Sequence, residues 1–201
     1  VLVGESVLGI ENSFLCPPGE YGNFLLEYDF KIDSRLNSGV QIRSRSFDYP
    51  VTISLGNGTT ITVPANRVHG YQIEIDNDPV RQRWWSAGLY EEGARGWIYP
   101  GLGGGDPIAF TQQGETITLV DDWNRVQVEA MGNRIRTWLN GQLRVDVTDP
   151  GITSGFFGFQ VHAIGTDTSK VGAKVLWRNI RVLPINTAPQ IDFESGGGLL
   201  R

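Results

Sequence analysis

Residues 125–141, RVQVEAMGNRIRTWLNG, decide the fold expected for this chain. Polar and apolar side chains alternate over residues 125–130 and again over 134–139, which is the period-two pattern of a strand with one buried face. A Gly-Asn pair lies between the two stretches at 132–133, and an Asn-Gly pair follows the second at 140–141. Both pairs tolerate the positive φ angles of tight hairpins. The segment therefore predicts antiparallel strands joined by tight turns.

The same pattern extends over most of the chain. Further alternating stretches rich in β-branched and aromatic residues occupy 24–32, 40–45, 51–55, 59–63, 71–76, 155–163 and 174–183. Nowhere do apolar residues recur at intervals of three and four over a dozen positions, so no long helix is expected. The Gly- and Pro-rich stretch 93–107 is typical of a long irregular loop. These features predict an all-β fold, a two-sheet antiparallel sandwich of the jelly-roll kind.

The domain organisation is expected to be simple. One domain should span residues 1–185, and residues 186–201, which contain a Ser-Gly-Gly-Gly run, should form a polar tail or linker. The chain starts at Val1 in a strand-like stretch rather than at a methionine, so we expect a signal segment or a first strand upstream. Cys16 is the only cysteine, which excludes an internal disulfide, and we expect it to be a small buried apolar residue.

Composition excludes several classes of partner. The 201 residues include 17 basic and 22 acidic side chains, a net charge of −5, and no run of Lys and Arg that could follow a phosphate backbone. Nucleic acid is therefore not an expected partner. No apolar stretch approaches the roughly 20 residues that a transmembrane helix needs.

Alternation also assigns the faces of three strands. In residues 71–76, Gln72, Glu74 and Asp76 share the face opposite the apolar side chains, and Gln41 and Arg43 do so in residues 40–45. In residues 155–163, Gln160 and His162 share the polar face. Any antiparallel sheet has a solvated face, but these side chains are planar donors and acceptors suited to hydroxyl groups. With Tyr90 and Trp97 as stacking aromatics, they predict a carbohydrate ligand on one sheet.

Six segments in order also carry a resemblance to a known family. They are NSGVQIR (37–43), RVHGYQIEID (67–76), SAGLYEEGARGWIYP (86–100), DDWNRVQVEAMGNRIRTWLNGQL (121–143), GFFGFQVHA (155–163) and WRNIRVL (177–183). The chain resembles the 3-keto-disaccharide hydrolase family from its first residues to about Ile185. A single motif such as WLNG recurs in many sandwich lectins and glucanases, whereas the ordered set is specific. Residues 46–66 depart from the family pattern, and we expect them to form an inserted hairpin just before the polar strand 71–76.

The resemblance implies a concanavalin A-like jelly roll, export to the periplasm or the cell exterior, and cleavage of glycosides already oxidised to a ketone at C3. The ketone acidifies the proton on C2. A base removes this proton, the enolate expels the group on C1, and water then adds. Such chemistry needs a base, a hydrogen-bond donor or cation for the enolate oxygen, and an acid for the leaving oxygen. The expected substrate is therefore an oxidised sugar.

Candidate catalytic residues follow from the spacing of the acids. Glu74 and Asp76 lie two positions apart on one strand, so their Cα atoms should be roughly 7 Å apart and their mutual repulsion should raise one pKa. Glu74 is the leading base, and Asp76 is its partner, an acid or a metal ligand. His69 enters as a catalytic candidate through the matched motif. Arg43 suits an enolate or a sugar hydroxyl, or else forms an ion pair with one of the acids.

Three questions stay open at this point. The two acids together with His69 or His162 could also hold a divalent cation, although no compact metal motif is present. The domain could be a non-catalytic carbohydrate-binding module, or a docking subunit of a larger protein assembly. A laminarinase-type glucanase is disfavoured, because its alternating Glu-x-Asp-x-Glu pattern would need a glutamate where Gln72 stands.

Overall fold

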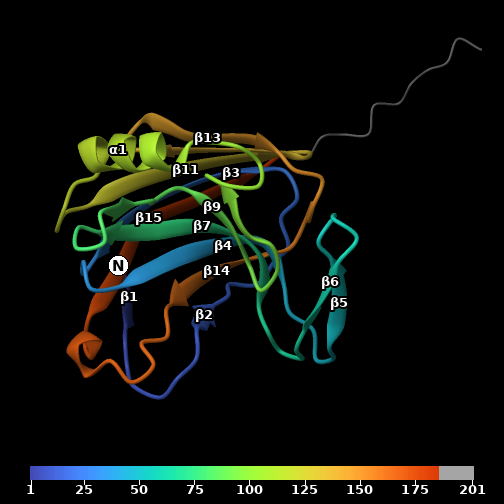
Figure 1. Ribbon diagram of the computed structural model, residues 1–201, viewed down its shortest axis with the longest axis horizontal. Helices are drawn as coiled ribbons and strands as arrows, with labels where there is room; N and C mark the ends of the chain where they lie inside the picture. Colours follow the sequence, from blue (N-terminus) through green and yellow to red (C-terminus); the bar gives the residue numbers. More distant parts are fainter. Residues whose placement is uncertain (186–201) are drawn as a thin grey trace, which may run out of the picture.

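The computed structural model describes residues 1–185, which form two antiparallel sheets packed face to face (Figure 1). The six-stranded sheet has the spatial order β1 (Leu2–Glu5), β15 (Lys174–Pro184), β3 (Phe24–Ile32), β11 (Asn124–Met131), β12 (Arg134–Leu139) and β13 (Gln142–Thr148). The seven-stranded sheet has the order β10 (Gly96–Tyr99), β9 (Leu89–Glu92), β7 (His69–Asp78), β4 (Asn37–Arg45), β14 (Phe156–Val161) and β2 (Ser13–Leu15), with β8 (Arg83–Trp84) also paired to β7. The predicted all-β jelly-roll sandwich is confirmed.

The hydrophobic core fills the space between the sheets, as the alternation of the strands requires. Tyr71, Ile73 and Ile75 of β7 and Val126 and Val128 of β11 are all buried there. Removing these side chains from water is the main favourable contribution to folding. Since one face of each strand is committed to the core, the opposite face of β7 is available for polar groups.

The turn that follows β12 has the geometry expected from its sequence. Asn140 and Gly141 have φ angles of 49° and 82°, the two positive values of a tight hairpin turn. Strands β11 and β12 pair from Val126 with Leu139 to Met131 with Arg134, so the preceding turn lies at the predicted Gly-Asn pair.

The region after residue 93 differs from the prediction of an irregular loop. It contains the edge strand β10 and, a few residues later, the helix α1 (Pro107–Ile117), which packs against β8 and β13 (Figure 1). Asp106 caps the helix by accepting hydrogen bonds from the amides of Ile108 and Ala109. The helix lacks a regular apolar stripe because it buries little more than Phe110, which explains why periodicity missed it. A short 3-10 turn, η1, spans Thr168–Lys170.

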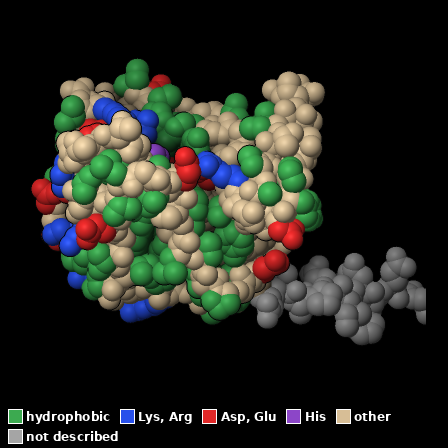
Figure 2. All heavy atoms as spheres, turned by 90° about the horizontal axis from the view of Figure 1, so that it is seen from below, with side chains coloured by type: hydrophobic (Ala, Val, Ile, Leu, Met, Phe, Trp, Pro, Cys, Tyr) green, Lys and Arg blue, Asp and Glu red, His purple; other side chains and the backbone are tan. Residues whose placement is uncertain are grey.

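A two-stranded hairpin projects from the sandwich between β4 and β7. It consists of β5 (Val51–Ser54) and β6 (Thr60–Val63), within the stretch 46–66 (Figure 1). Residues 49–66 contain no charged side chain, whereas acidic and basic groups are interspersed over the face shown in Figure 2. The hairpin is observed; that it is an insertion relative to the family remains a prediction.

Three other expectations have different outcomes. Cys16 is exposed, so the prediction of a buried cysteine is wrong. The predicted tail 186–201 lies outside the described residues. Over the described part of the chain, no helix is long and apolar enough to cross a membrane.

Candidate functional site

A polar cavity of about 220 Å³ lies on the seven-stranded sheet, over the face of β7 opposite the core. Its walls come from strands β4, β7, β8, β9, β10 and β14 and from the residue that follows β14. The lining side chains are Asn37, Gln72, Glu74, Arg83, Tyr90, Glu92, Trp97, Gln160 and His162. The face assignments of β7 and β14 thus bring Gln72, Glu74, Gln160 and His162 together as predicted from alternation.

Glu74 is the central carboxyl group of this cavity. Its side chain is 3% exposed, and burial raises its pKa to about 8, with repulsion from the neighbouring Asp76 adding to the shift. Gln72 opposes the shift by donating from Nε2 to Glu74 Oε2 at 2.9 Å, and Asn37 donates to Oε1 at 3.4 Å. No ion pair to Glu74 is found within residues 1–185. The group can therefore exchange a proton close to neutral pH.

Asp76 shares the face of Glu74 but is engaged elsewhere. It forms a buried ion pair with Arg83, and its backbone amide donates to Ser86 Oγ at 2.9 Å. Burial raises the pKa of Asp76 while Arg83 lowers it. Asp76 is not among the residues that line the cavity. It acts on the site through the charge that it places beside Glu74.

Arg43 does not reach the cavity, so its assignment to the polar face is wrong. The β4–β7 register shifts between Ile42 and Arg45, and Arg43 has a φ of 48°, which breaks the alternation of β4. The guanidinium is buried beside the Phe24 ring and donates to the carbonyl oxygens of Gly22 and Gly132, both at 2.8 Å. Arg43 therefore ties β4 to two turns and pairs with neither acid.

The two histidines have different surroundings. His69 is buried at the far end of β7 beside Phe47, with Nδ1 3.2 Å from the Arg67 carbonyl oxygen, and it does not line the cavity. His162 does line it, and its Nδ1 lies 2.7 Å from the Ala163 carbonyl oxygen. Because a carbonyl oxygen only accepts, Nδ1 carries the hydrogen and the neutral ring is left with an unprotonated Nε2. His162, rather than His69, is thus the histidine available for chemistry at the site.

Three glutamines support the floor of the cavity. Gln41 is fully buried on the polar face and donates from Nε2 to Gln72 Oε1 at 2.5 Å. Gln72 in turn donates to Gln160 Oε1 at 3.4 Å. Gln41 itself does not line the cavity, so its predicted contact with a ligand becomes a contact with Gln72.

Aromatic side chains form one wall, as the sequence predicted for Tyr90 and Trp97. Their rings meet edge to face with centroids 5.3 Å apart, and Trp85 contacts Trp97 in the same manner at 4.5 Å. The Arg83 guanidinium lies 5.8 Å from the centroid of the Trp97 ring. Burial and the negative charges of Glu92 and Glu74 raise the pKa of Tyr90. The wall therefore combines aromatic rings with charged groups of both signs.

The sequence matches the model of the 3-keto-alpha-glucoside-1,2-lyase-like domain over residues 2–183. The chain belongs to this family. The resemblance drawn from the six ordered segments is therefore confirmed. No curated protein matches the sequence.

Solved structures share the fold of this 3-keto-alpha-glucoside-1,2-lyase-like domain at low sequence identity. A putative glycosyl hydrolase from Parabacteroides distasonis is 18% identical over 88% of this chain and 85% of its own, with a TM-score of 0.50. The carbohydrate-binding module CBM66 from Bacillus subtilis is 16% identical over 87% of this chain and 83% of its own, with a TM-score of 0.44. At 18% identity the likeness to the Parabacteroides distasonis protein concerns the fold alone.

Three lining residues of the lyase-like domain were missed by sequence reasoning. Asn37 lies an even number of positions before Gln41 on β4, and Glu92 two positions after Tyr90 on β9, so alternation could have found both. Glu92 forms an ion pair with Arg67, with Nη2 and Oε1 2.5 Å apart. Arg83 belongs to a two-residue strand and carried no periodic signal.

The arrangement of the acidic and histidine side chains bears on whether the domain could hold a metal ion. Within residues 1–185, no three or more His, Cys, Asp and Glu side chains are grouped so as to hold a metal ion. Glu74 accepts hydrogen bonds from two amides, and Asp76 is paired with Arg83. The carboxylate-histidine cation site that the sequence left open does not correspond to a cluster in this part of the chain.

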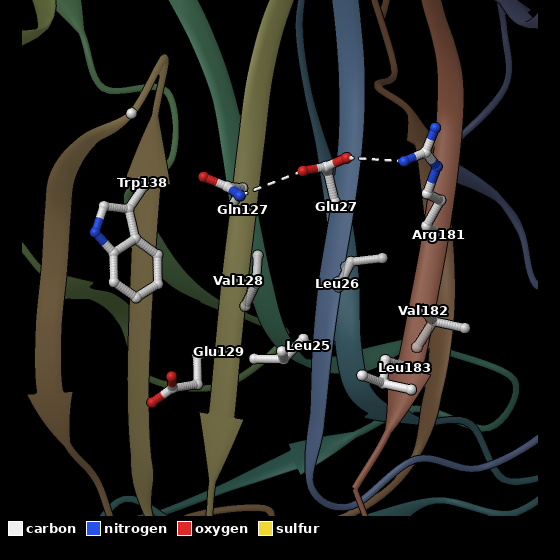
Figure 3. A pocket seen from close by; sticks show the side chains of 11 residues that line it. Leu25, Leu26, Glu27, Gln127, Val128, Glu129, Trp138, Arg181, Val182 and Leu183 are labelled. Carbon is white, nitrogen blue, oxygen red and sulfur yellow. Dashed lines mark hydrogen bonds and ion pairs between the residues drawn. The ribbon is translucent and has the colours of Figure 1, made fainter.

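A larger hollow, of about 540 Å³, lies on the outer face of the six-stranded sheet (Figure 3). Its polar groups are engaged with one another, since Gln127 donates to Glu27 at 3.2 Å and Arg181 lies 3.8 Å from the same carboxylate. Much of the remaining lining is apolar, including the exposed Leu183. The smaller cavity over β7 is the better candidate, because it contains the buried carboxyl group with a raised pKa.

Proposed function

We propose that the domain cleaves 3-keto-glycosides by elimination followed by hydration. The Glu74 carboxylate removes the proton from C2, the electron pair forms the enolate of the C3 ketone, and collapse of the enolate breaks the bond between C1 and the glycosidic oxygen. The leaving oxygen takes up a proton and departs as an alcohol. Water then adds across the C1–C2 double bond to give the free 3-keto sugar.

The observation that carries this proposal is the state of Glu74. A base for a C2 proton acidified by a ketone works best when its pKa is near the working pH, and burial raises the pKa of Glu74 to about 8. Two other acids near the site, Asp76 and Glu92, are held in ion pairs with Arg83 and Arg67. Glu74 is thus the carboxyl group best suited to take a proton from a ligand.

The other lining residues supply the remaining parts of the reaction. His162 in its protonated form would donate from Nε2 to the leaving oxygen, because its Nδ1 is held by the Ala163 carbonyl. Tyr90 and Trp97 offer ring faces and edges for a sugar ring. The roles predicted for His69 and Arg43 in catalysis receive no support from their positions.

The test is release of the alcohol from a 3-keto-glucoside by the purified protein, with the unoxidised glucoside as substrate control and with a chelator in a parallel reaction. Release that requires the ketone and is lost in Glu74→Gln would support the proposal. The matched control is Glu115→Gln, which replaces an exposed carboxyl group on α1. A folded protein that releases nothing from the ketone would rule out the enzymatic function.

A second candidate function is non-catalytic carbohydrate binding. It is favoured by the aromatic wall of Tyr90 and Trp97 and by the ion pairs that hold Asp76 and Glu92. Calorimetric titration with the unoxidised glucoside distinguishes it, because a binding module would take up this ligand without product release.

A further inference from the structure

A directed chain of hydrogen bonds runs beneath the cavity and ends at Gln160. Ser44 Oγ donates to Gln41 Oε1 at 2.6 Å, and Gln41 Nε2 donates to Gln72 Oε1 at 2.5 Å. Gln72 Nε2 then donates to two acceptors, Glu74 Oε2 at 2.9 Å and Gln160 Oε1 at 3.4 Å. Four of these five side chains are amides or hydroxyl groups that could point either way in isolation.

The carboxylate determines the direction of the chain. An ionised Glu74 only accepts hydrogen bonds, so the end of the Gln72 amide that faces it must be the nitrogen. The Gln72 oxygen must then face a donor, which is Gln41 Nε2, and the Gln41 oxygen faces the hydroxyl of Ser44. The second hydrogen on Gln72 Nε2 is used by the oxygen of Gln160. Gln72 has therefore no donor left for a ligand.

Gln160 is the one amide in this hydrogen-bond chain whose nitrogen donates to no acceptor among the described residues. Its side chain is fully buried, it lines the cavity, and its Nε2 has no hydrogen-bond partner among the described residues. A buried donor without a partner destabilises the folded state, because it has lost its hydrogen bonds to water. Five buried side-chain polar atoms of the described residues have no partner, and Gln160 Nε2 is the one that belongs to a residue lining this cavity.

We propose that Gln160 Nε2 donates to the C3 oxygen of the bound 3-keto ring and to the enolate that forms from it. Gln72, Gln41 and Ser44 are positioning residues that hold this amide with its oxygen on Gln72 Nε2, which leaves its nitrogen for the ligand. The inference rests on the proposed function, because it assigns a donor for the enolate oxygen of that reaction. Glu74 and Gln160 both accept a hydrogen bond from Gln72 Nε2, so they lie close together. This proximity suits two groups that act on the adjacent atoms C2 and C3.

The donor becomes more important as negative charge develops. A ketone oxygen accepts a hydrogen bond weakly, whereas an enolate oxygen in a cavity shielded from water accepts it strongly. Loss of one such preorganised donor typically lowers kcat by roughly 10² to 10³. The effect should fall on kcat more than on KM, since the interaction strengthens mainly in the transition state.

The test combines kinetics with infrared spectroscopy of the bound ketone. Gln160→Met keeps the length of the side chain and removes the donor, and should lower kcat by roughly 10²-fold with a much smaller change in KM. In the protein that keeps Glu74, a 3-keto-glucoside analogue whose glycosidic oxygen is replaced by carbon cannot lose its C1 group, and the carbonyl band of this bound ketone should lie below its position in water-free solvent. Adding Gln160→Met should return the band upward, and adding Ser44→Ala should move it part of the way.

The outcomes separate this inference from the proposed function. If the wild-type protein releases product but Gln160→Met keeps its kcat and its carbonyl band, the assignment of Gln160 is overturned and the function stands. If the wild-type protein neither binds nor cleaves the 3-keto-glucoside, both are overturned. If circular dichroism shows that Gln160→Met does not fold, the band shift caused by Ser44→Ala tests the assignment instead. An unchanged carbonyl band in Ser44→Ala would then overturn the role of the hydrogen-bond chain.

Discussion

Replacing Glu74 by glutamine is expected to remove activity and, at the same time, to stabilise the folded protein at alkaline pH. The side chain is 3% exposed and faces Asp76 along the strand, so its ionised form is disfavoured in the fold. A neutral amide of the same shape avoids this penalty at every pH. Under the proposed function, the domain retains a destabilising group because the reaction needs it.

The magnitude follows from the shift in pKa. Glu74 titrates near 4.5 in the unfolded chain, whereas burial raises its pKa to about 8 in the folded protein. Between these values the folded state holds more protons than the unfolded state, so the free energy of unfolding falls as the pH rises. At about 1.4 kcal/mol per pKa unit, this loss is about 1 kcal/mol near a pH of about 5 and about 4 to 5 kcal/mol above a pH of about 8.

The glutamine variant has one cost of its own. Gln72 and Asn37 both donate to Glu74, and an amide can accept at one end alone, so a mismatched hydrogen bond costs about 1 kcal/mol. The variant should therefore match the wild type near a pH of about 5 and exceed it by about 3 to 4 kcal/mol near a pH of about 9.

Urea unfolding followed by tryptophan fluorescence over this pH range measures the difference, with Glu115→Gln as the exposed control. In the same series, kcat/KM of the wild type should be low at acid pH, because a protonated Glu74 cannot accept the C2 proton, and should rise as Glu74 ionises. The variant should lose roughly 10² to 10⁴ of the rate. A stability difference that does not change with pH, or a wild type that is the more stable protein at high pH, would refute the reasoning.

Three further changes test the placement of other residues. In Gly39→Ala the new Cβ would lie 2.4 Å from the side chain of Gln72, so we expect activity to fall at least tenfold with the fold retained, as judged by kinetics and circular dichroism. Arg43→Met should lower the free energy of unfolding by about 2 kcal/mol through lost carbonyl contacts and leave KM unchanged, and a large rise in KM would instead place Arg43 at the ligand. Trp97→Ala should raise KM for the 3-keto-glucoside severalfold with little change in kcat, because the ring packs against Tyr90 as part of the wall; an unaffected KM would remove it from the ligand site.

Much of the site could be predicted from alternation, because the pairing of β7 with β4 is regular from Tyr71 to Asp76 and that of β14 is regular from Gly158 onward. Gln72, Glu74 and Gln160 lie where a period of two places them. The raised pKa was also expected from two acids on one face, although burial proves to be the larger cause.

The predictions that placed Arg43 and His69 at the site failed because of local irregularities in the backbone. Arg43 follows a register shift in β4, and a single irregular residue sends the next side chains to the other face. His69 adjoins Gly70, whose φ of 133° changes the backbone course at the start of β7. Neither irregularity leaves a periodic trace in the sequence.

Arg83 and α1 were missed for a different reason. The partnership of Arg83 with Asp76 depends on how β8 returns to β7, which is a tertiary contact. The helix α1 is secured by Asp106 at its N-terminus and by Arg144, which donates to the Phe110 carbonyl, and these contacts replace an apolar stripe. Attention to the Asp-Pro start would have indicated the helix.

The position of β10 bears on how such a protein can diversify. Trp97 stands on the outermost strand of its sheet, whereas Glu74 stands on β7, which is bonded on both sides by β4 and β9. Substitutions or length changes at β10 can thus reshape the wall that a leaving group would meet without disturbing the ladder that holds the base. Under the proposed function, descendants of one ancestral domain can acquire new aglycone preferences at this edge while they inherit the same base.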